Sequence, residues 1–535
     1  MINRCKTKNK SFPLLIVFAV AFIIRIIHLN SYTSYPAFDF PVGGHAGYVL
    51  MALKILGGDI LGGTELFFDN SPIYYYILAG MFKIFGIDFY AIRFVQILIG
   101  SLNCYLIALI AFHYFGLTPA LVSGIISAFY GPFIFYDAEI IVLPWVLFFC
   151  LLSILMIVKN NASRNLYWSC SGILLGAAVM GRPNLIFFPV LLLFYFLSGR
   201  TFKKNLIQRI RSYGWFFIGV MLFPGIFLIR NYAASGEVHF LNPSAGHNFY
   251  FGHKKNASPY FNESLIFRGA ILLKYKEIAE SHGKKALTAN EVSDYWFKKG
   301  LENITAHPFD EFKLALAKAR YFFNDQAMPS YFNYDFNRKY SIVLKHCALT
   351  FGFIFPLAIL GFFITRHNAS KLMVLYLFFL TSFFSIVLFF VIERLRIPGV
   401  PVIIMFSGIG LNHIFNQCKE KAFKSLILTG IILAPLYWMT FTPLVHINDA
   451  HNYNLIGVAL WQKGDIQEAE KAFQEALDLD SGFEFPLLNL IQMFDQTGDK
   501  EKENTYRKKY ETLKERFGST DWNTEELTKY IRPYR

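Results

Sequence analysis

Charged residues are scarce in this sequence. Asp, Glu, Lys and Arg make up 16% of its 535 residues, whereas hydrophobic residues make up 54% and aromatic residues 18%. The length alone would suggest several soluble domains. However, apolar runs of about 17–25 residues recur from Ser11 to about Leu444, and each is long enough to cross a bilayer as a helix. The low charge content therefore indicates an all-α polytopic membrane protein.

Cysteine is scarce as well. The chain has 6 cysteines, nearly all of them in or beside apolar runs, and no two are spaced as a CxxC pair. This excludes a disulfide framework and a cysteine-based metal cluster as organising features.

Acidic residues are almost absent from the apolar runs themselves. Transporters tend to place charge and interrupted helices at mid-membrane, so their scarcity disfavours a transporter. Polar residues collect instead where runs end on one side. This pattern indicates work at the outer membrane interface, on a substrate with one apolar and one polar end.

The net charge of +14 does not indicate nucleic-acid binding, because the basic residues cluster between apolar runs. With the N-terminus in the cytoplasm, stretches such as "GRTFKKNLIQRIR" (199–211) and "CKEKAFK" (418–424) fall on the inner side, as the positive-inside rule requires. The first run contains Arg25 and no small-residue cleavage site follows it, so we expect an uncleaved span rather than a signal peptide.

Eleven runs are predicted to cross the membrane. They are 12–29, 90–112, 118–136, 140–158, 167–181, 184–198, 213–229, 346–365, 372–391, 398–415 and 425–444. The outer side then holds a first loop (30–89), the "YDAE" turn (136–139), a second large loop (230–345) and everything after 444. The lipid bilayer is therefore a predicted partner, and the cytoplasmic (inner) membrane is the predicted location.

The apolar segment 71–86 is too short to be assigned as a span. If it crossed, every later loop would change sides and violate the charge rule. We therefore expect it to lie along the outer interface, with Tyr74, Tyr75 and Tyr76 in the headgroup region.

Residues 445–535 are polar and differ in composition from the predicted membrane domain, 1–444. Helix–turn–helix patterns recur with turns at Gly464-Asp465 and, 34 residues later, at Gly498-Asp499. The period and layout resemble the tetratricopeptide repeat, more strongly in the first copy than in the second. Two repeats are few for an independent solenoid, so we expect this extracytoplasmic domain to lean on the membrane part or on a protein partner.

The outer loops contain candidate catalytic groups. The first loop offers Asp39 and His45, and the "YDAE" turn offers Asp137 and Glu139, while Tyr48 of the first loop is a candidate for binding the sugar or the acceptor. Carboxylates from two loops could deprotonate an acceptor hydroxyl or amine, or hold a divalent metal such as Mg²⁺ or Mn²⁺ between Asp39 and Glu139. Each also has a structural interpretation: Asp39 as a turn residue, and the "YDAE" acids as helix N-terminal residues.

Basic residues on the outer side are candidate phosphate ligands. "ERLR" places Arg394 and Arg396 where the charge rule does not predict them, and guanidinium suits a phosphate in geometry and charge. Arg230 either binds substrate or snorkels to the interface. In the aromatic stretch that follows, His247, Asn248 and His253 either shape the loop or contact a sugar.

Three pieces carry a family resemblance: "SPIYYYILAGMFKIFG…AIRFVQILIGSL", "IRNYAASGEVHFLNPSAGHNFYFGH" and "ERLRIPGVP", in this order. Together they resemble the GT-C superfamily of membrane glycosyltransferases, in particular the protein O-mannosyltransferase and lipid A aminoarabinose transferase relatives. The resemblance implies a polyprenyl-phosphate-linked sugar donor, an outward-facing site and inversion at the anomeric carbon. It also implies an acidic base in the first loop, a second carboxylate at "YDAE" and donor-phosphate binding by the "RLR" arginines, with Lys318 as a further phosphate candidate.

The chain departs from this pattern at one position. An aspartate is expected four residues before Tyr48, and Gly44 stands there. Three alternatives follow for the catalytic base. Asp39 serves as the base through a shifted loop, or His45 serves as the base, or the enzyme has lost its base. The sequence thus predicts a glycosyltransferase acting at the outer face on a lipid, glycan or protein. The alternatives are a catalytically degenerate scaffold that binds lipid-linked glycan, and a lipid or glycan transporter.

Overall fold

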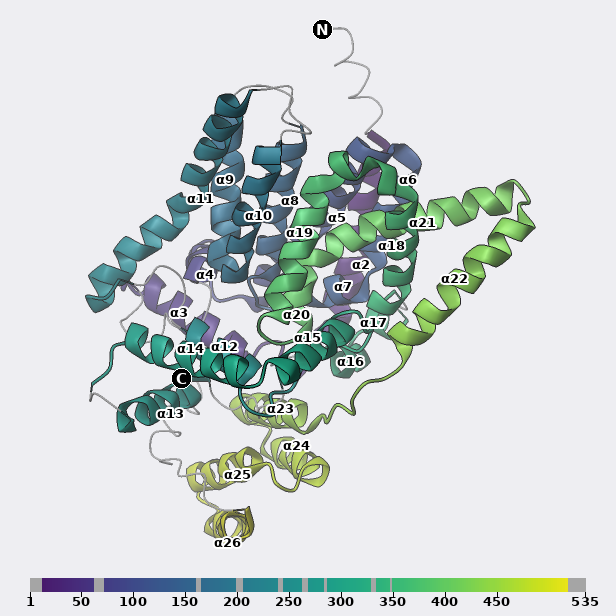
Figure 1. Ribbon diagram of the computed structural model, residues 1–535. Coiled ribbons are helices and arrows are strands. Elements are labelled where there is room, and N and C mark those ends of the chain that lie inside the picture. Colours follow the sequence, from purple (N-terminus) through teal and green to yellow (C-terminus); the bar gives the residue numbers. More distant parts are fainter. Residues whose placement is uncertain are drawn as a thin grey trace.

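The computed structural model describes residues 12–61, 72–159, 165–198, 205–238, 244–261, 268–282, 286–328, 333–346 and 349–517. Within these ranges the protein is helical and contains no strand, apart from two isolated bridges, Tyr130–Leu349 and Tyr260–Val391. A bundle of apolar helices forms the upper part of the molecule in Figure 1, and shorter helices cover its lower end. The predicted all-α fold is confirmed.

The bundle helices coincide with the predicted spans. They are α2 (Leu15–Tyr32), α5 (Phe89–Phe115), α6 (Leu117–Phe129) with α7 (Gly131–Asp137), α8 (Leu143–Lys159), α9 (Asn165–Gly181), η2 (Pro183–Ile186) with α10 (Phe187–Ser198), α11 (Leu206–Ser235), α18 (Phe351–Thr365), α19 (Ala369–Val387), α21 (Val400–Lys419) and α22 (Phe423–Phe441). By length and composition, six helical segments of the described residues can cross a membrane, and several shorter apolar helices accompany them. The protein is a multi-pass membrane protein.

One predicted span is broken. The run 118–136 becomes α6 and α7, separated by an extended residue, Tyr130. The Gly131 N–H donates to the Leu349 carbonyl at 2.9 Å, and Pro132 follows at the start of α7. Since α7 is entirely buried, the break carries the chain into the protein and positions the "YDAE" turn beneath neighbouring helices.

The loops predicted to share one side meet at one end of the bundle. Figure 1 shows α3 (Gly44–Leu56), α12 (Ala245–His253), α14 (Ala289–Ala306), α15 (Pro308–Phe322) and α20 (Glu393–Arg396) at the lower end. The remaining short helices of the large loop are α13 (Arg268–Ser281), α16 (Tyr334–Asn337), η3 (Arg338–Tyr340) and α17 (Ile342–His346). The bundle's other short helices are η1 (Phe12–Leu14), η4 (Arg366–Asn368) and η5 (Ile397–Gly399).

Segment 71–86 forms α4 (Pro72–Phe85), which packs on α3, α5 and α9. Tyr74 and Tyr75 are 0% and 1% exposed, and the Tyr74 hydroxyl donates to the Gln96 side-chain oxygen. The prediction that these two rings lie among lipid headgroups is therefore wrong. They face the protein because α3 and α5 offer them both apolar contact and a hydrogen-bond acceptor.

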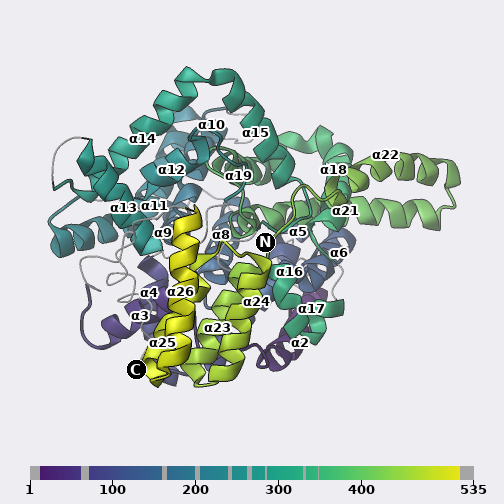
Figure 2. The same cartoon turned by 90° about the horizontal axis from the view of Figure 1, so that it is seen from below.

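The polar C-terminal region forms two helix pairs, α23 (Ala450–Lys463) with α24 (Ile466–Leu479) and α25 (Glu484–Thr497) with α26 (Lys500–Phe517). Gly464 and Gly498 end the first helix of each pair with φ of +94° and +79°, the left-handed conformation that glycine adopts without strain. Figure 1 shows the repeats beneath the lower end of the bundle, and in Figure 2, which is seen from below, they lie in front of it.

The repeats pack directly on the membrane part. Leu455 and Ile456 of α23 belong to the same buried cluster as the bundle helices. The Lys339 ammonium lies 3.7 Å from the centre of the Phe336 ring and 4.7 Å from that of Tyr453, which joins the second large loop to α23. The first repeat therefore buries one of its faces against the membrane domain, which supplies the partner that two isolated repeats lack.

Candidate active site

Glu139 is the centre of a buried polar cluster at the lower end of the bundle. The Tyr32 hydroxyl donates to Glu139 Oε1 at 2.6 Å, and His45 Nε2 lies 3.4 Å from Glu139 Oε2. Glu139 is 1% exposed and His45 4%. The structure thus joins the "YDAE" turn to the first outer loop, and it brings together two of the four predicted catalytic residues.

Side chains of α5 hold the turn that carries Glu139. Arg93 Nε donates to the Ala138 carbonyl at 2.9 Å, and Gln96 Nε2 donates to the Glu139 carbonyl. Both side chains are buried inside a predicted span. The chain leaves the helix after α7, so Arg93 satisfies the buried Ala138 carbonyl. Gln96 adds a second donor to the Glu139 carbonyl, which also accepts from the Ile141 N–H at 2.8 Å.

Burial shifts the pKa values of Glu139 and His45 in opposite directions. Burial raises the pKa of Glu139 to about 7, although Arg93 and the Tyr32 hydrogen bond favour its carboxylate form. Burial, followed by the charges of Arg93 and Arg394, holds the pKa of His45 well below its ordinary value. At neutral pH His45 is therefore neutral, and Glu139 exchanges a proton in the range that suits a general base.

Arginines surround this cluster. Arg394 is close enough to act electrostatically on both His45 and Tyr136, and Arg182 acts on Tyr136 as well. The Tyr136 hydroxyl donates to Glu393 Oε2 at 3.0 Å, which ties α7 to α20 beside Arg394. The predicted phosphate ligand Arg394 and the predicted carboxylate Glu139 thus lie around one site.

Asp137 does not face this site. Its Oδ2 lies 2.7 Å from Nε of Arg25, with both side chains buried. Arg25 also donates to the Ala21 and Ala128 carbonyls at 3.3 Å. The placement therefore gives Asp137 a structural partner inside the bundle and leaves Glu139 as the carboxylate of the "YDAE" turn in the cluster.

Asp39 and Tyr48 border the cluster rather than join it. Asp39 is exposed and acts on Arg93 through its charge, and the Arg93 guanidinium lies 4.1 Å from the centre of the Phe38 ring. Tyr48 is 4% exposed and packs edge-on against Tyr74 at 4.9 Å, so it lines the protein interior. In the described part of the chain, no three His, Cys, Asp or Glu side chains form a metal-ligating group; a metal between Asp39 and Glu139 stays a prediction.

The other predicted phosphate ligands have protein partners. Arg396 Nη1 donates to the Phe322 carbonyl at 3.0 Å and to that of Asn324, and its guanidinium lies 4.0 Å from the centre of the Phe351 ring. Arg396 therefore ties α20 to the end of α15. Its role as a phosphate ligand stays a prediction.

Arg230 and Lys318 lie elsewhere. Arg230 donates to the Leu61 carbonyl and, at 2.9 Å, to Asn231 Oδ1, at the end of α11 that projects away from α20 in Figure 1. Lys318 is 1% exposed and donates to the Gly252 carbonyl at 2.8 Å. Burial lowers the pKa of Lys318 to about 8, and Glu311 opposes that shift. Their phosphate roles stay predictions as well.

His247 and Asn248 lie on α12 in the second large loop. The His247 ring stacks on Tyr275 with centroids 5.7 Å apart, and the Asn248 N–H continues the helix by donating to the Ser244 carbonyl. Their predicted sugar contact is not tested by this placement.

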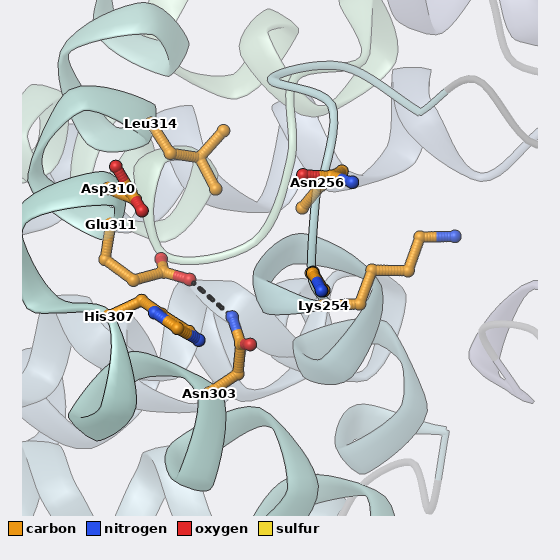
Figure 3. A pocket seen from close by; sticks show the side chains of 9 residues that line it. Lys254, Asn256, Asn303, His307, Asp310, Glu311 and Leu314 are labelled. Atoms are coloured by element: carbon orange, nitrogen blue, oxygen red, sulfur yellow. Dashed lines mark hydrogen bonds between the residues drawn. The ribbon is translucent and has the colours of Figure 1, made fainter.

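Residues 254–257 and the facing parts of α14 and α15 line a pocket, here called the loop pocket. In it Asn303 Nδ2 donates to Glu311 Oε1 at 3.2 Å (Figure 3).

Sequence reasoning missed Tyr32, Arg93, Gln96, Arg182 and Glu393. Arg93 carried a usable signal, because an ionisable side chain within an apolar run is costly and marks a functional position. Tyr32 and Gln96 carried none, since a tyrosine or glutamine near the end of a span is ordinary.

Residues 69–226 match the family model described as dolichyl-phosphate-mannose-protein mannosyltransferase, and residues 450–483 match the tetratricopeptide repeat. The first match supports the predicted resemblance to the protein mannosyltransferases over residues 69–226. It spans Arg93, Asp137, Glu139 and Arg182, so it contains the turn at the centre of the buried polar cluster. No curated protein matches the chain.

Two solved structures share a distant likeness with this chain. One is the archaeal oligosaccharyltransferase AglB from Archaeoglobus fulgidus, in complex with an inhibitory peptide and a dolichol-phosphate; identity is 14%, TM-score 0.46, and coverage 88% of this chain and 60% of that chain. The other is ArnT from Cupriavidus metallidurans bound to undecaprenyl phosphate, with 14% identity, TM-score 0.29 and coverage of 76% and 79%. This chain thus spans 60% of the AglB length. At TM-scores below 0.5, neither likeness carries an argument about this site.

Proposed function

We propose that this protein transfers a sugar from a polyprenyl-phosphate-linked donor to an acceptor at the outer face of the cytoplasmic membrane. The observation that carries the proposal is the buried pair of Glu139 and His45, 3.4 Å apart, with Arg394 close enough to act on His45 through its charge. The matched family's description names a dolichyl-phosphate sugar as donor, and this supports the donor class. A carboxylate beside an arginine fits group transfer better than a scaffold or a transport path.

The proposed reaction is a single displacement with inversion. Glu139 takes the proton of an acceptor hydroxyl or amine as that atom attacks the anomeric carbon. The bond between this carbon and the phosphate oxygen breaks, and the phosphate leaves with its negative charge stabilised by Arg394. Because His45 lies over Glu139 Oε2 and Glu139 is 1% exposed, the acceptor reaches the carboxylate only when His45 moves aside.

The first test is transfer from a radiolabelled polyprenyl-phosphate sugar by the purified full-length protein in lipid nanodiscs, with lipid, glycan and protein acceptors. We expect wild-type protein to transfer label to one of these acceptor classes. Carrier binding without transfer to any acceptor would instead establish the scaffold, and movement of intact carrier between leaflets would establish the transporter.

Arg394→Ala is expected to lower transfer by about 10²-fold or more, because the departing phosphate then loses a cation. Arg394→Lys should recover only part of the rate, since an ammonium lacks the planar fork of guanidinium. Initial rates at saturating acceptor measure both. Arg230→Ala is the comparison, as Arg230 lies at the end of α11 away from α20. If the two alanine variants lose activity equally, Arg394 has no special role.

Transfer is expected to fall as pH drops through about 7, because protonation of Glu139 removes the base. Tyr32→Phe deletes a hydrogen bond that favours the carboxylate, so it raises the pKa of Glu139. The acid limb of the pH–rate profile, where the transfer rate falls, therefore moves to higher pH. Transfer rates from pH 5.5 to pH 8.5 measure this limb. Tyr35→Phe is the matched control, since it keeps Tyr32, whose ring stacks on Tyr35 at 5.1 Å. An unshifted limb in Tyr32→Phe would assign the titration to another group.

A further inference from the structure

The second large outer loop forms hydrogen bonds with the segment that links α19 to α20. His253 Nε2 lies 2.8 Å from the Leu388 carbonyl oxygen. Two backbone hydrogen bonds add to this contact. The Val391 N–H donates to the Pro259 carbonyl at 2.9 Å, and the Glu393 N–H donates to the Met328 carbonyl at 2.9 Å. The Leu388 and Phe389 N–H groups still donate to the end of α19, at 2.9 Å and 3.1 Å. Residues 390–392 lie outside any helix, so the bonds from the loop help to set the path of this segment.

The backbone at the end of α12 lies in close contact with the backbone of the segment that links α19 to α20, which limits movement between the two. A Cβ atom on Gly252 would lie 2.2 Å from the Phe389 carbonyl oxygen, so α12 meets the linking segment without an intervening side chain. Lys318 holds the same glycine from the other side through its 2.8 Å bond to the Gly252 carbonyl. The end of α12 therefore has little freedom to shift relative to Leu388.

His253 is held at both ring nitrogens. Its Nδ1 lies 2.7 Å from Glu311 Oε2, and Asn303 Nδ2 donates both to the His253 carbonyl at 2.6 Å and to Glu311 Oε1 at 3.2 Å. Figure 3 shows the Asn303–Glu311 bond at the rim of the loop pocket. Because a carbonyl oxygen only accepts, Nε2 carries its hydrogen and donates to Leu388. The imidazole thus connects α14 and α15 to the end of α19.

Arg394 lies six residues after Leu388, on the four-residue helix α20. On its other side α20 is fixed by the Tyr136–Glu393 hydrogen bond, which comes from the bundle. Arg394 is therefore carried by a segment that is attached to the bundle through Glu393 and to the outer loop through Leu388, Val391 and Arg396. A change in the attachment at Leu388 changes where Arg394 stands relative to Glu139.

We propose that His253 is a positioning residue for the donor phosphate: by holding the Leu388 carbonyl, it sets the place of Arg394. This rests on the proposed function, because it assigns Arg394 to the carrier phosphate. Because both ring nitrogens of His253 have protein partners in Glu311 and Leu388, we assign it a role through Arg394 rather than contact with donor or acceptor. Its effect is expected on donor affinity rather than on the chemical step.

The test is a double-mutant cycle on the full-length protein in nanodiscs, with binding of undecaprenyl phosphate and the kinetics of sugar transfer both measured. His253→Ala is expected to weaken carrier binding and raise the donor KM by about tenfold, with kcat within about twofold of wild type. In the Arg394→Ala background the same substitution is expected to change binding by less than about twofold, because the positioned group is already absent.

Glu311→Gln separates positioning from charge. Glutamine still engages Nδ1 and leaves the Nε2–Leu388 bond intact, so its donor KM should stay close to wild type. His282→Ala is the matched histidine control, because the His282 ring bonds within its own segment, to the Ile278 carbonyl at 2.8 Å. Thermal unfolding of each variant identifies any that lose the fold.

Equal carrier binding by wild type and His253→Ala would overturn the inference and leave the proposed function standing. So would a loss of the same size with and without Arg394, because His253 would then act independently of it. If wild-type protein neither binds the carrier nor transfers sugar, the proposed function fails and the inference with it.

Discussion

Glu139→Gln is expected to reduce kcat for sugar transfer by about 10²–10⁴-fold, the usual contribution of a positioned general base. The substitution is nearly isosteric, and the amide oxygen still accepts the Tyr32 hydroxyl, which bonds Glu139 Oε1 at 2.6 Å in the native cluster. Carrier binding should be unchanged because no cation is removed. Single-turnover transfer with bound donor measures the chemical step without contributions from substrate association.

Asp39→Asn and His45→Ala complete this experiment, because the first loop holds the competing candidates. Asp39 is exposed and lies beyond Arg93, so its amide variant should keep most of the activity. His45→Ala uncovers Glu139 Oε2, from which His45 Nε2 is 3.4 Å away, and should affect acceptor KM more than kcat. If Asp39→Asn abolishes transfer while Glu139→Gln keeps it, the base is Asp39 and the missing aspartate at Gly44 reflects a shifted loop.

Breaking the Arg25–Asp137 pair is expected to have the largest effect on folding. The two side chains are buried in the bundle 2.7 Å apart, and removing one partner leaves an uncompensated buried charge, which costs about 3–5 kcal/mol. Asp137→Asn and Arg25→Met should each unfold at lower SDS concentration than wild type. The double variant Arg25→Met/Asp137→Asn should recover much of the loss, because no charge is then left alone.

An exposed ion pair provides the control. Lys463 Nζ and Asp465 Oδ2 are also 2.7 Å apart, but their side chains are 54% and 38% exposed, so Lys463→Met should leave the unfolding midpoint nearly unchanged. If Asp137→Asn unfolds like wild type and loses only transfer, Asp137 belongs to the reaction rather than to the fold.

The sequence predicted the membrane helices well because their signal is local. Each predicted span is a run of apolar residues whose length a bilayer dictates. Helices occupy these runs in the structure, with run 118–136 divided between α6 and α7. The break at Tyr130 was not predictable, since it depends on the Leu349 carbonyl that accepts from Gly131. The repeat turns at Gly464 and Gly498 were predicted because a left-handed helix end has a short sequence signature.

Individual site residues were harder because their partners are distant in sequence. Asp137 and Glu139 are two residues apart, and only contacts with Arg25 and Tyr32, both in α2, separate a buried ion pair from a member of the polar cluster. Arg394 and Arg396 were predicted as a pair. Residues two apart on a helix point in different directions, and Arg396 donates to the Phe322 carbonyl, a partner that the sequence alone does not reveal.

The attachment of the repeats to the bundle has a consequence for how acceptors are presented. With α23 sharing the bundle's buried cluster and Lys339 lying between Phe336 and Tyr453, the first repeat is fixed in place instead of swinging on a linker. A protein held by such a fixed platform stays within a constant reach of the bundle end. Its local concentration there then depends on geometry rather than on its abundance, so even weak capture could favour substrates that the active site alone does not select.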